Sequence, residues 1–185
     1  MLYLIIITFA IIVGLLRGGE IERLSNISIK GSYLFVFALI LRGSLFFVGL
    51  LKISIFFEYA NIILIISYLV LIYVSLKNLR LPGFKYITMG VLLNGFVIMV
   101  NGGKMPVIIN KQIAQYADAV TNLSEQGKNL IYSINNSNAL FVFLGDVLPL
   151  PSPFPESSIL SVGDILIFAG LFILIQKAII KEDTL

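Results

Sequence analysis

The chain has 185 residues, of which 58% are hydrophobic and only 12% charged, with a mean hydropathy of +1.01 and a net charge of +3. An average soluble domain carries about 25% charged residues, so a soluble protein of this composition would expose too much apolar surface. The sequence has no Cys, His or Trp, which excludes disulfides, Cys/His zinc sites and nucleophiles activated by imidazole. We therefore predict an integral membrane protein without a metal or cofactor, and the absence of a basic patch interleaved with aromatics argues against a nucleic-acid partner.

Apolar runs recur along the chain, and the first, residues 2–16, spans only about 22 Å as a helix. It lacks the preceding basic region and the following small-residue site of a secretory signal, so we interpret it as a retained helix. Together the runs predict an all-α membrane protein with about five transmembrane helices in one domain, residues 1–185. The predicted spans are residues 2–16, 32–51, 59–76, 86–100 and 159–180.

Basic residues set the expected orientation. With the N-terminus outside, the cytoplasmic segments hold eight Lys and Arg residues and the external segments four, which favours an N-out, C-in protein of the bacterial cytoplasmic membrane. Residues 101–158 are then extracytoplasmic. Within them, apolar residues repeat every three or four positions over residues 108–123, which predicts an amphipathic helix at the membrane interface or over the mouth of the bundle.

This topology gathers unusual polar residues at the outer face. Asp146 lies in the outer segment, and Asp164 lies about one turn into the last span. Two carboxyl groups sharing a site separate their proton affinities, so that one can act as an acid and the other as a base. A lysine and exposed glycine amides could hold an anion nearby. The candidate binding residues here are Asn101, Gly102, Gly103 and Lys104.

Each of these residues also has a structural interpretation. Asp164 could cap the last helix, and Asp146 could cap a turn. The two glycines could end the fourth helix, and Lys104 could extend toward lipid headgroups.

Arg42 and Asn94 are polar residues inside predicted spans. A guanidinium at mid-bilayer costs at least about 2.5 kcal/mol, so Arg42 should face the bundle and find a partner. We expect that partner to be Asp164, Asn94 or free carbonyls of a broken helix. For Asn94 an interhelical hydrogen bond is expected more than a ligand contact.

The strings at residues 101–107, 144–149 and 161–165, together with Arg17-Gly18-Gly19, resemble a family of small bacterial multi-pass membrane proteins catalogued as a domain of unknown function. The resemblance covers most of the chain and implies a cytoplasmic-membrane protein without indicating an activity.

The stretch from Ser161 to Gly170 is also similar, more weakly, to the aspartic lipoprotein signal peptidases. In those enzymes a second catalytic aspartate begins the last helix, so the resemblance implies Asp146 and Asp164 as a catalytic pair. The sequence departs from the family motif, because Ser161 replaces Asn and Gly163 replaces Ala. Five spans are also predicted instead of four.

Three functions therefore stay open. The first is a binding protein or complex subunit that uses the outer face, with membrane lipids or a membrane protein as partner. The second is an aspartyl membrane peptidase using Asp146 and Asp164, and the third is a small transporter component using Arg42 and Asn94.

Overall fold

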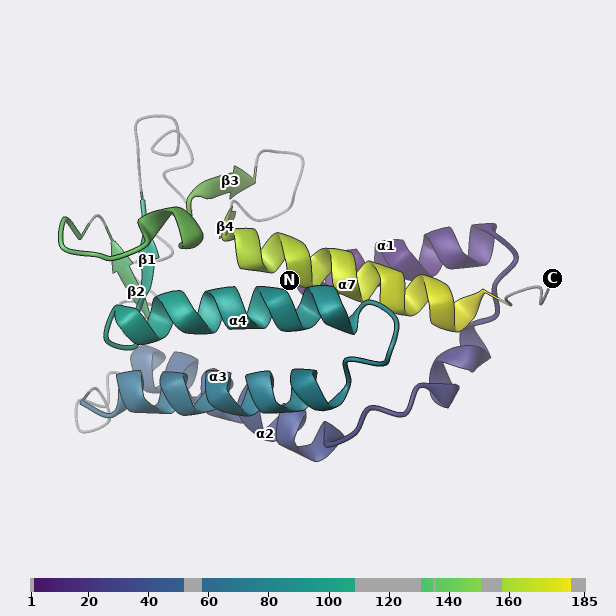
Figure 1. Cartoon of the computed structure of the whole chain (residues 1–185), viewed down its shortest axis with the longest axis horizontal. Helices are drawn as coiled ribbons and strands as arrows, with labels where there is room; N and C mark the ends of the chain where they lie inside the picture. The colour runs from purple at the N-terminus through teal and green to yellow at the C-terminus, as the bar shows by residue number, and fades with distance from the viewer. Residues whose placement is uncertain (1, 52–57, 109–130, 135, 151–157, 181–185) are drawn as a thin grey trace.

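The computed structural model describes residues 2–51, 58–108, 131–134, 136–150 and 158–180. This part of the chain is mostly helical. Its long helices are α1 (Leu2–Leu16), α2 (Ser32–Leu50), α3 (Ala60–Lys77), α4 (Phe84–Val100) and α7 (Val162–Ile179). They lie with their axes roughly along the long axis of the molecule, with short strands at one end (Figure 1).

The helices pack in the order α1, α7, α4, α3, α2, so that the last helix lies between the first and the fourth. Residues 78–83 form a tight turn that makes α3 and α4 antiparallel neighbours. Close contacts between Gly83 and Gly170 and between Gly90 and Gly163 show that α4 and α7 are antiparallel as well. The core is centred on α3 and α4 and includes Leu64, Tyr68, Val91, Val97 and Ile98.

Helices α1 and α7 run in the same direction. The ring of Tyr3 packs edge-on against Phe168, and further along both helices in the same direction Phe9 stacks on Phe172. At the far end, the Gln176 amide donates to the Ala10 carbonyl at 2.6 Å. When helices alternate in direction along a chain, the first and the last are parallel if the number of helices is odd.

Both Gly-Gly pairs end helices in the same way. At the end of α1, Gly19 N–H donates to Gly14 O and Gly18 N–H to Leu15 O. At the end of α4, Gly103 N–H donates to Ile98 O, while Gly102 N–H donates to Met99 O. This pair of bonds is the Schellman motif, whose left-handed residue is Gly18 (φ +80°) in α1 and Gly102 (φ +67°) in α4.

The segment between α4 and α7 contains short strands, so the fold is not purely helical. Strand β1 (Met105–Val107) pairs in parallel with β2 (Tyr132–Ile134), and β3 (Leu148–Leu150) pairs antiparallel with β4 (Ser158–Leu160). A 3-10 turn, η4 (Val142–Leu144), lies between them, and another, η1 (Ile21–Asn26), links α1 to α2. The predicted amphipathic helix over 108–123 lies, apart from Ile108, outside the described residues.

The predicted spans agree with the helices except at their ends. Helix α4 begins at Phe84 instead of 86, because Gly83 in the left-handed conformation (φ +78°) closes the preceding turn. The last helix begins at Val162 instead of 159, since residues 158–160 pair as strand β4. The other bounds shift by one residue at most.

Two of the helices, α3 and α7, are long and apolar enough to cross a membrane, each with a mean hydropathy of 2.0. In both, only 39% of the span is buried within the protein, so apolar side chains face outward. The stretches Leu2–Leu16, Ser32–Leu45 and Phe84–Val100 are apolar but shorter. Among the described residues, two helices are thus long enough to meet the criterion for crossing a membrane, whereas the sequence predicted about five spans.

Candidate functional site

Asp164 is held at the start of α7 by a reciprocal cap. The Asp164 N–H donates to Ser161 Oγ at 3.0 Å, and the Ser161 N–H donates to Asp164 Oδ2 at 3.1 Å. This capping box satisfies two N–H groups that a helix start leaves free and places the carboxylate at the positive end of the helix dipole. The structural interpretation of Asp164 as a cap is therefore confirmed.

Asn94 of α4 completes this network. Its amide nitrogen donates to Asp164 Oδ1 at 3.0 Å, and its amide oxygen accepts from Ser161 Oγ at 2.9 Å. Asn94 is 2% exposed and Ser161 is fully buried. The interhelical hydrogen bond predicted for Asn94 is thus present, and it connects α4 to the start of α7.

Glycines make this contact possible. A Cβ atom on Gly163 would lie 2.1 Å from Asn94 Oδ1 and 2.7 Å from the Gly90 carbonyl oxygen. A Cβ on Gly90 would in turn lie 2.3 Å from the Gly163 oxygen. The Gly163 that departs from the signal-peptidase motif is therefore required here by close packing of two helices.

Asp146 is positioned by backbone pairing with strand β1. Its N–H donates to Pro106 O at 2.9 Å, and its carbonyl accepts from Ile108 N–H at 3.2 Å. The preceding Gly145 permits this approach, because a Cβ there would lie 2.3 Å from the Pro106 oxygen. The backbone of Asp146 is thus fixed beside the end of α4.

The Asp146 side chain is buried, with 7% of the residue exposed, and its Oδ1 has no hydrogen-bond partner among the described residues. Burial raises the pKa of this carboxyl well above its usual range, and the nearby Asp164 carboxylate raises it further, while Arg42 opposes both. A buried acid without a partner favours its neutral, protonated form. The two aspartates therefore differ: Asp164 takes part in three hydrogen bonds, whereas the Oδ1 atom of Asp146 has no hydrogen-bond partner among the described residues.

Arg42 and three tyrosines surround the acid pair. The guanidinium carbon of Arg42 in α2 lies 4.8 Å from the centre of the Tyr68 ring of α3, which is a cation–π arrangement. Tyr3 of α1 and Tyr132 of β2 belong to the same electrostatic neighbourhood as Arg42. The expectation that Asp164 or Asn94 partners Arg42 is wrong, because both are already committed to the capping network and an aromatic face is available.

Three of the four candidate binding residues at the end of α4 have structural roles, namely Asn101, Gly102 and Gly103. The Asn101 amide donates to Leu140 O at 2.9 Å and accepts from Leu140 N–H at 2.8 Å, so it fastens the outer segment to the end of α4. Gly103 packs against α3, where a Cβ would lie 2.6 Å from Asn61 Cβ. Within the described chain, Lys104 forms no ion pair with either aspartate.

Polar groups from every long helix and from the outer segment thus converge at one end of the bundle. Sequence reasoning missed Ser161 and the tyrosines Tyr3, Tyr68 and Tyr132. The spacing Ser161-x-x-Asp164 is a capping-box pattern that could have identified Ser161. The tyrosines carry no such signal, since tyrosine is common at membrane interfaces.

The fold and site define a mostly helical protein, with apolar helices packed side by side and a buried carboxyl, Asp146, near the capped Asp164 at one end. The chain belongs to the family described as "Family of unknown function (DUF5317)", whose model matches residues 26–176. It is 30% identical over 155 residues to an "Uncharacterized protein" of Thermotoga maritima, a match that covers 84% of this chain and 79% of the relative. No solved structure matches it.

Proposed function

We propose that the chain crosses a bacterial cytoplasmic membrane five times, N-out and C-in, through α1, α2, α3, α4 and α7. The parallel arrangement of α1 and α7, with antiparallel contacts between the other neighbours, supports this path. The distribution of charge supports the orientation, because the described basic residues concentrate at the end where α1, α3 and α7 finish. These are Arg17, Arg23, Lys30, Lys77, Arg80, Lys85 and Lys177.

In this proposal the outer end of the bundle binds a polar group of a lipid or of a membrane partner. One observation carries this function: the Asp146 carboxyl is buried, and its Oδ1 lacks a hydrogen-bond partner among the described residues. A buried polar atom without a hydrogen bond lowers the free energy of unfolding by about 1–3 kcal/mol. The presence of Asp146 at this position therefore favours a functional role over a role in folding. A hydroxyl, amide or amine of a ligand would satisfy Asp146, and Arg42 would favour a ligand that also carries an acceptor oxygen.

The hydrogen bonds of Asp164 favour a binding function over a catalytic one. Both carboxylate oxygens of Asp164 already accept hydrogen bonds, from Asn94 and from the Ser161 N–H. The capping box and the bond to Asn94 account for the presence of Asp164 through helix capping and packing alone, without a catalytic role. Asp164 is therefore better suited to fix the site than to react in it.

Native mass spectrometry of the full chain, purified in a mild detergent, tests the proposal. The wild-type spectrum should contain a bound lipid or other small molecule, and Asp146→Ala should reduce its occupancy at least about tenfold. The matched control is Glu22→Gln, which removes an exposed acid from the opposite end. A wild-type protein without a bound molecule, or equal occupancy in Asp146→Ala, would contradict the proposal.

A second candidate is an aspartyl peptidase. It is supported by the electrostatic interaction between Asp146 and Asp164 and by the raised pKa of the Asp146 carboxyl, since paired acids divide the roles of acid and base. Cleavage of a fluorogenic lipopeptide by the purified protein tests this function. Asp146→Asn and Asp164→Asn should each abolish cleavage at least about a hundredfold, and an inactive wild type would exclude it.

A further inference from the structure

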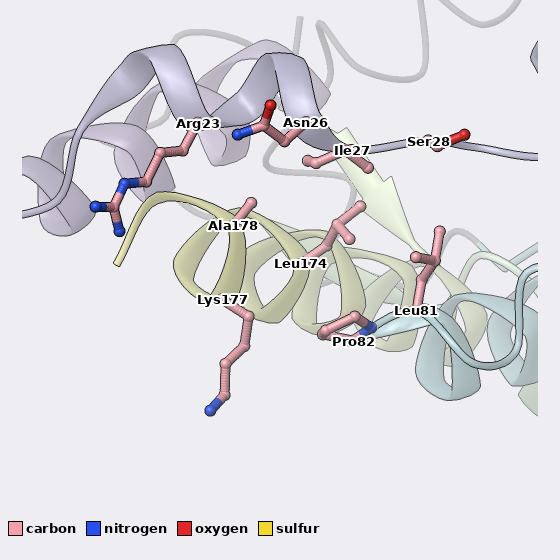
Figure 2. A pocket seen from close by; sticks show the side chains of 9 residues that line it. All are labelled: Arg23, Asn26, Ile27, Ser28, Leu81, Pro82, Leu174, Lys177 and Ala178. Atoms are coloured by element: carbon pink, nitrogen blue, oxygen red, sulfur yellow. The ribbon is translucent and has the colours of Figure 1, made fainter. Parts of the chain in front are cut away.

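The opposite end of the molecule contains an open groove that the acid pair does not explain. Its volume is about 430 Å³, and it lies between η1 with the residues that follow it, the turn joining α3 to α4, and the last turns of α7 (Figure 2). The residues that line it are Arg23, Asn26, Ile27, Ser28, Leu81, Pro82, Leu174, Lys177 and Ala178.

The groove combines an apolar floor with cationic and polar edges. Leu174 and Ala178 point from α7 toward Ile27, and Arg23 and Lys177 stand on different sides of this floor (Figure 2). Asn26 and Ser28 add hydrogen-bonding side chains along one edge. This composition matches a molecule with a negative head and an apolar body.

The surrounding charge has one predominant sign. Five further cations belong to this end of the bundle: Arg17, Lys30, Lys77, Arg80 and Lys85. Within the described chain, the acids at this end are Glu20 and Glu22, and Glu20 accepts from Arg23 Nε at 2.9 Å. Because an ion pair at the protein surface is weak, a phosphate can compete with the largely exposed Glu20 for Arg23. The remaining donors of the guanidinium fork suit phosphate oxygens.

We propose that this groove binds the headgroup phosphate of an anionic phospholipid of the cytoplasmic leaflet, with an acyl chain along the apolar floor. This inference rests on the N-out, C-in orientation of the proposed function, which places the groove on the cytoplasmic side. Basic pockets between helices on that side fit anionic headgroups, because the positive charge and the nearby apolar surface match both parts of the lipid.

Titration of the full chain in detergent with phosphatidylglycerol or phosphatidylcholine, read by native mass spectrometry, tests the proposal. Wild type should bind phosphatidylglycerol in preference to phosphatidylcholine, and the double variant Arg23→Gln, Lys177→Gln should weaken phosphatidylglycerol binding at least about tenfold. The matched control is Arg80→Gln, Lys85→Gln, which removes two exposed cations that do not line the groove. This control should change the affinity less than about twofold.

Several outcomes would overturn the proposal. Equal loss in both double variants would show general charge attraction, and unchanged binding in the groove variant would assign the lipid elsewhere. Binding only in a variant that ends at Ile180 would assign the groove to the chain's own acidic end, which contains Glu182 and Asp183. Displacement by inorganic phosphate without any lipid preference would identify a free-phosphate site. A loss of occupancy in Asp146→Ala concerns the other end, so failure of the binding proposed at the outer end is distinguishable from failure of lipid binding in this groove.

Discussion

At the scale of single residues, the two aspartates show how identical side chains acquire different roles. Asp164 is the third residue of a helix and accepts hydrogen bonds from Ser161 and Asn94, so its charge stabilises the fold. Asp146 follows a glycine in an extended segment, where pairing with β1 fixes its backbone, and its buried Oδ1 has no hydrogen-bond partner among the described residues. Asp164 therefore stabilises the folded protein, whereas the buried carboxyl of Asp146 destabilises it.

Replacing Asn94 should destabilise the protein. Asn94→Ala leaves the buried Ser161 hydroxyl and the Asp164 carboxylate each without one partner, which should cost about 1–3 kcal/mol. Thermal unfolding of the purified protein in detergent, followed by circular dichroism, measures this loss. Asn26→Ala is the control, because Asn26 is exposed and should change stability by less than about 0.5 kcal/mol. Equal stability of the two variants would show that the network has no energetic role.

At the scale of elements, the interface between α4 and α7 depends on two glycine pairs spaced seven residues apart. Gly83 faces Gly170, and Gly90 faces Gly163. Without side chains at these positions the helix backbones approach closely, which is a common basis of helix association in membranes. This close approach is what allows Asn94 to reach the start of α7.

Adding one methyl group in this interface should therefore be costly. A Cβ at Gly170 would lie 2.6 Å from the Gly83 oxygen and 2.9 Å from the Ile87 nitrogen, so Gly170→Ala should cost about 1–3 kcal/mol. The control is Gly43→Ala in α2, where nothing lies within 4 Å of the added atom. That change should be neutral or stabilise by up to about 1 kcal/mol, because alanine favours helix. Similar melting temperatures for the two variants would refute tight packing at Gly170.

The helices were predictable from the sequence because each is a long apolar run bounded by glycine, proline or charge. The strands were not, since Met105–Val107 and Tyr132–Ile134 are three residues long and pair across a wide sequence separation. At the site, the predicted cap at Asp164 and the predicted interhelical hydrogen bond of Asn94 are present, and the binding or catalytic roles of the two aspartates stay predictions. The prediction failed for Arg42, because its preference for the Tyr68 face depends on how α2 packs against α3.

At the scale of the whole molecule, the alternation of helix direction and the charge at one end make the orientation testable. The chain has no cysteine, so a single introduced cysteine reports its own location. Ser137→Cys and Ser28→Cys are conservative changes at exposed positions on the two sides. In intact cells a membrane-impermeant maleimide should label Ser137→Cys at once and Ser28→Cys only after permeabilisation. The reverse pattern, or equal labelling, would contradict the N-out, C-in path.

The central claim is that Asp146 is a buried acid retained for binding at a cost in stability. Because its pKa is raised in the folded state, the unfolded chain loses this proton first as pH rises. Wild-type stability should therefore fall from about pH 4, the ordinary pKa of aspartate, until the folded pKa is reached. Asp146→Asn, which stays neutral, should lack this loss.

The most direct measurement compares the unfolding free energy of wild type and Asp146→Asn in detergent between pH 4 and pH 8. The two should have similar stability near pH 4, and the variant should be more stable at pH 8 by on the order of 1 kcal/mol or more. A variant that is less stable than wild type at pH 8 would show that the charged Asp146 holds the fold together, and the binding role proposed for it would lose its basis.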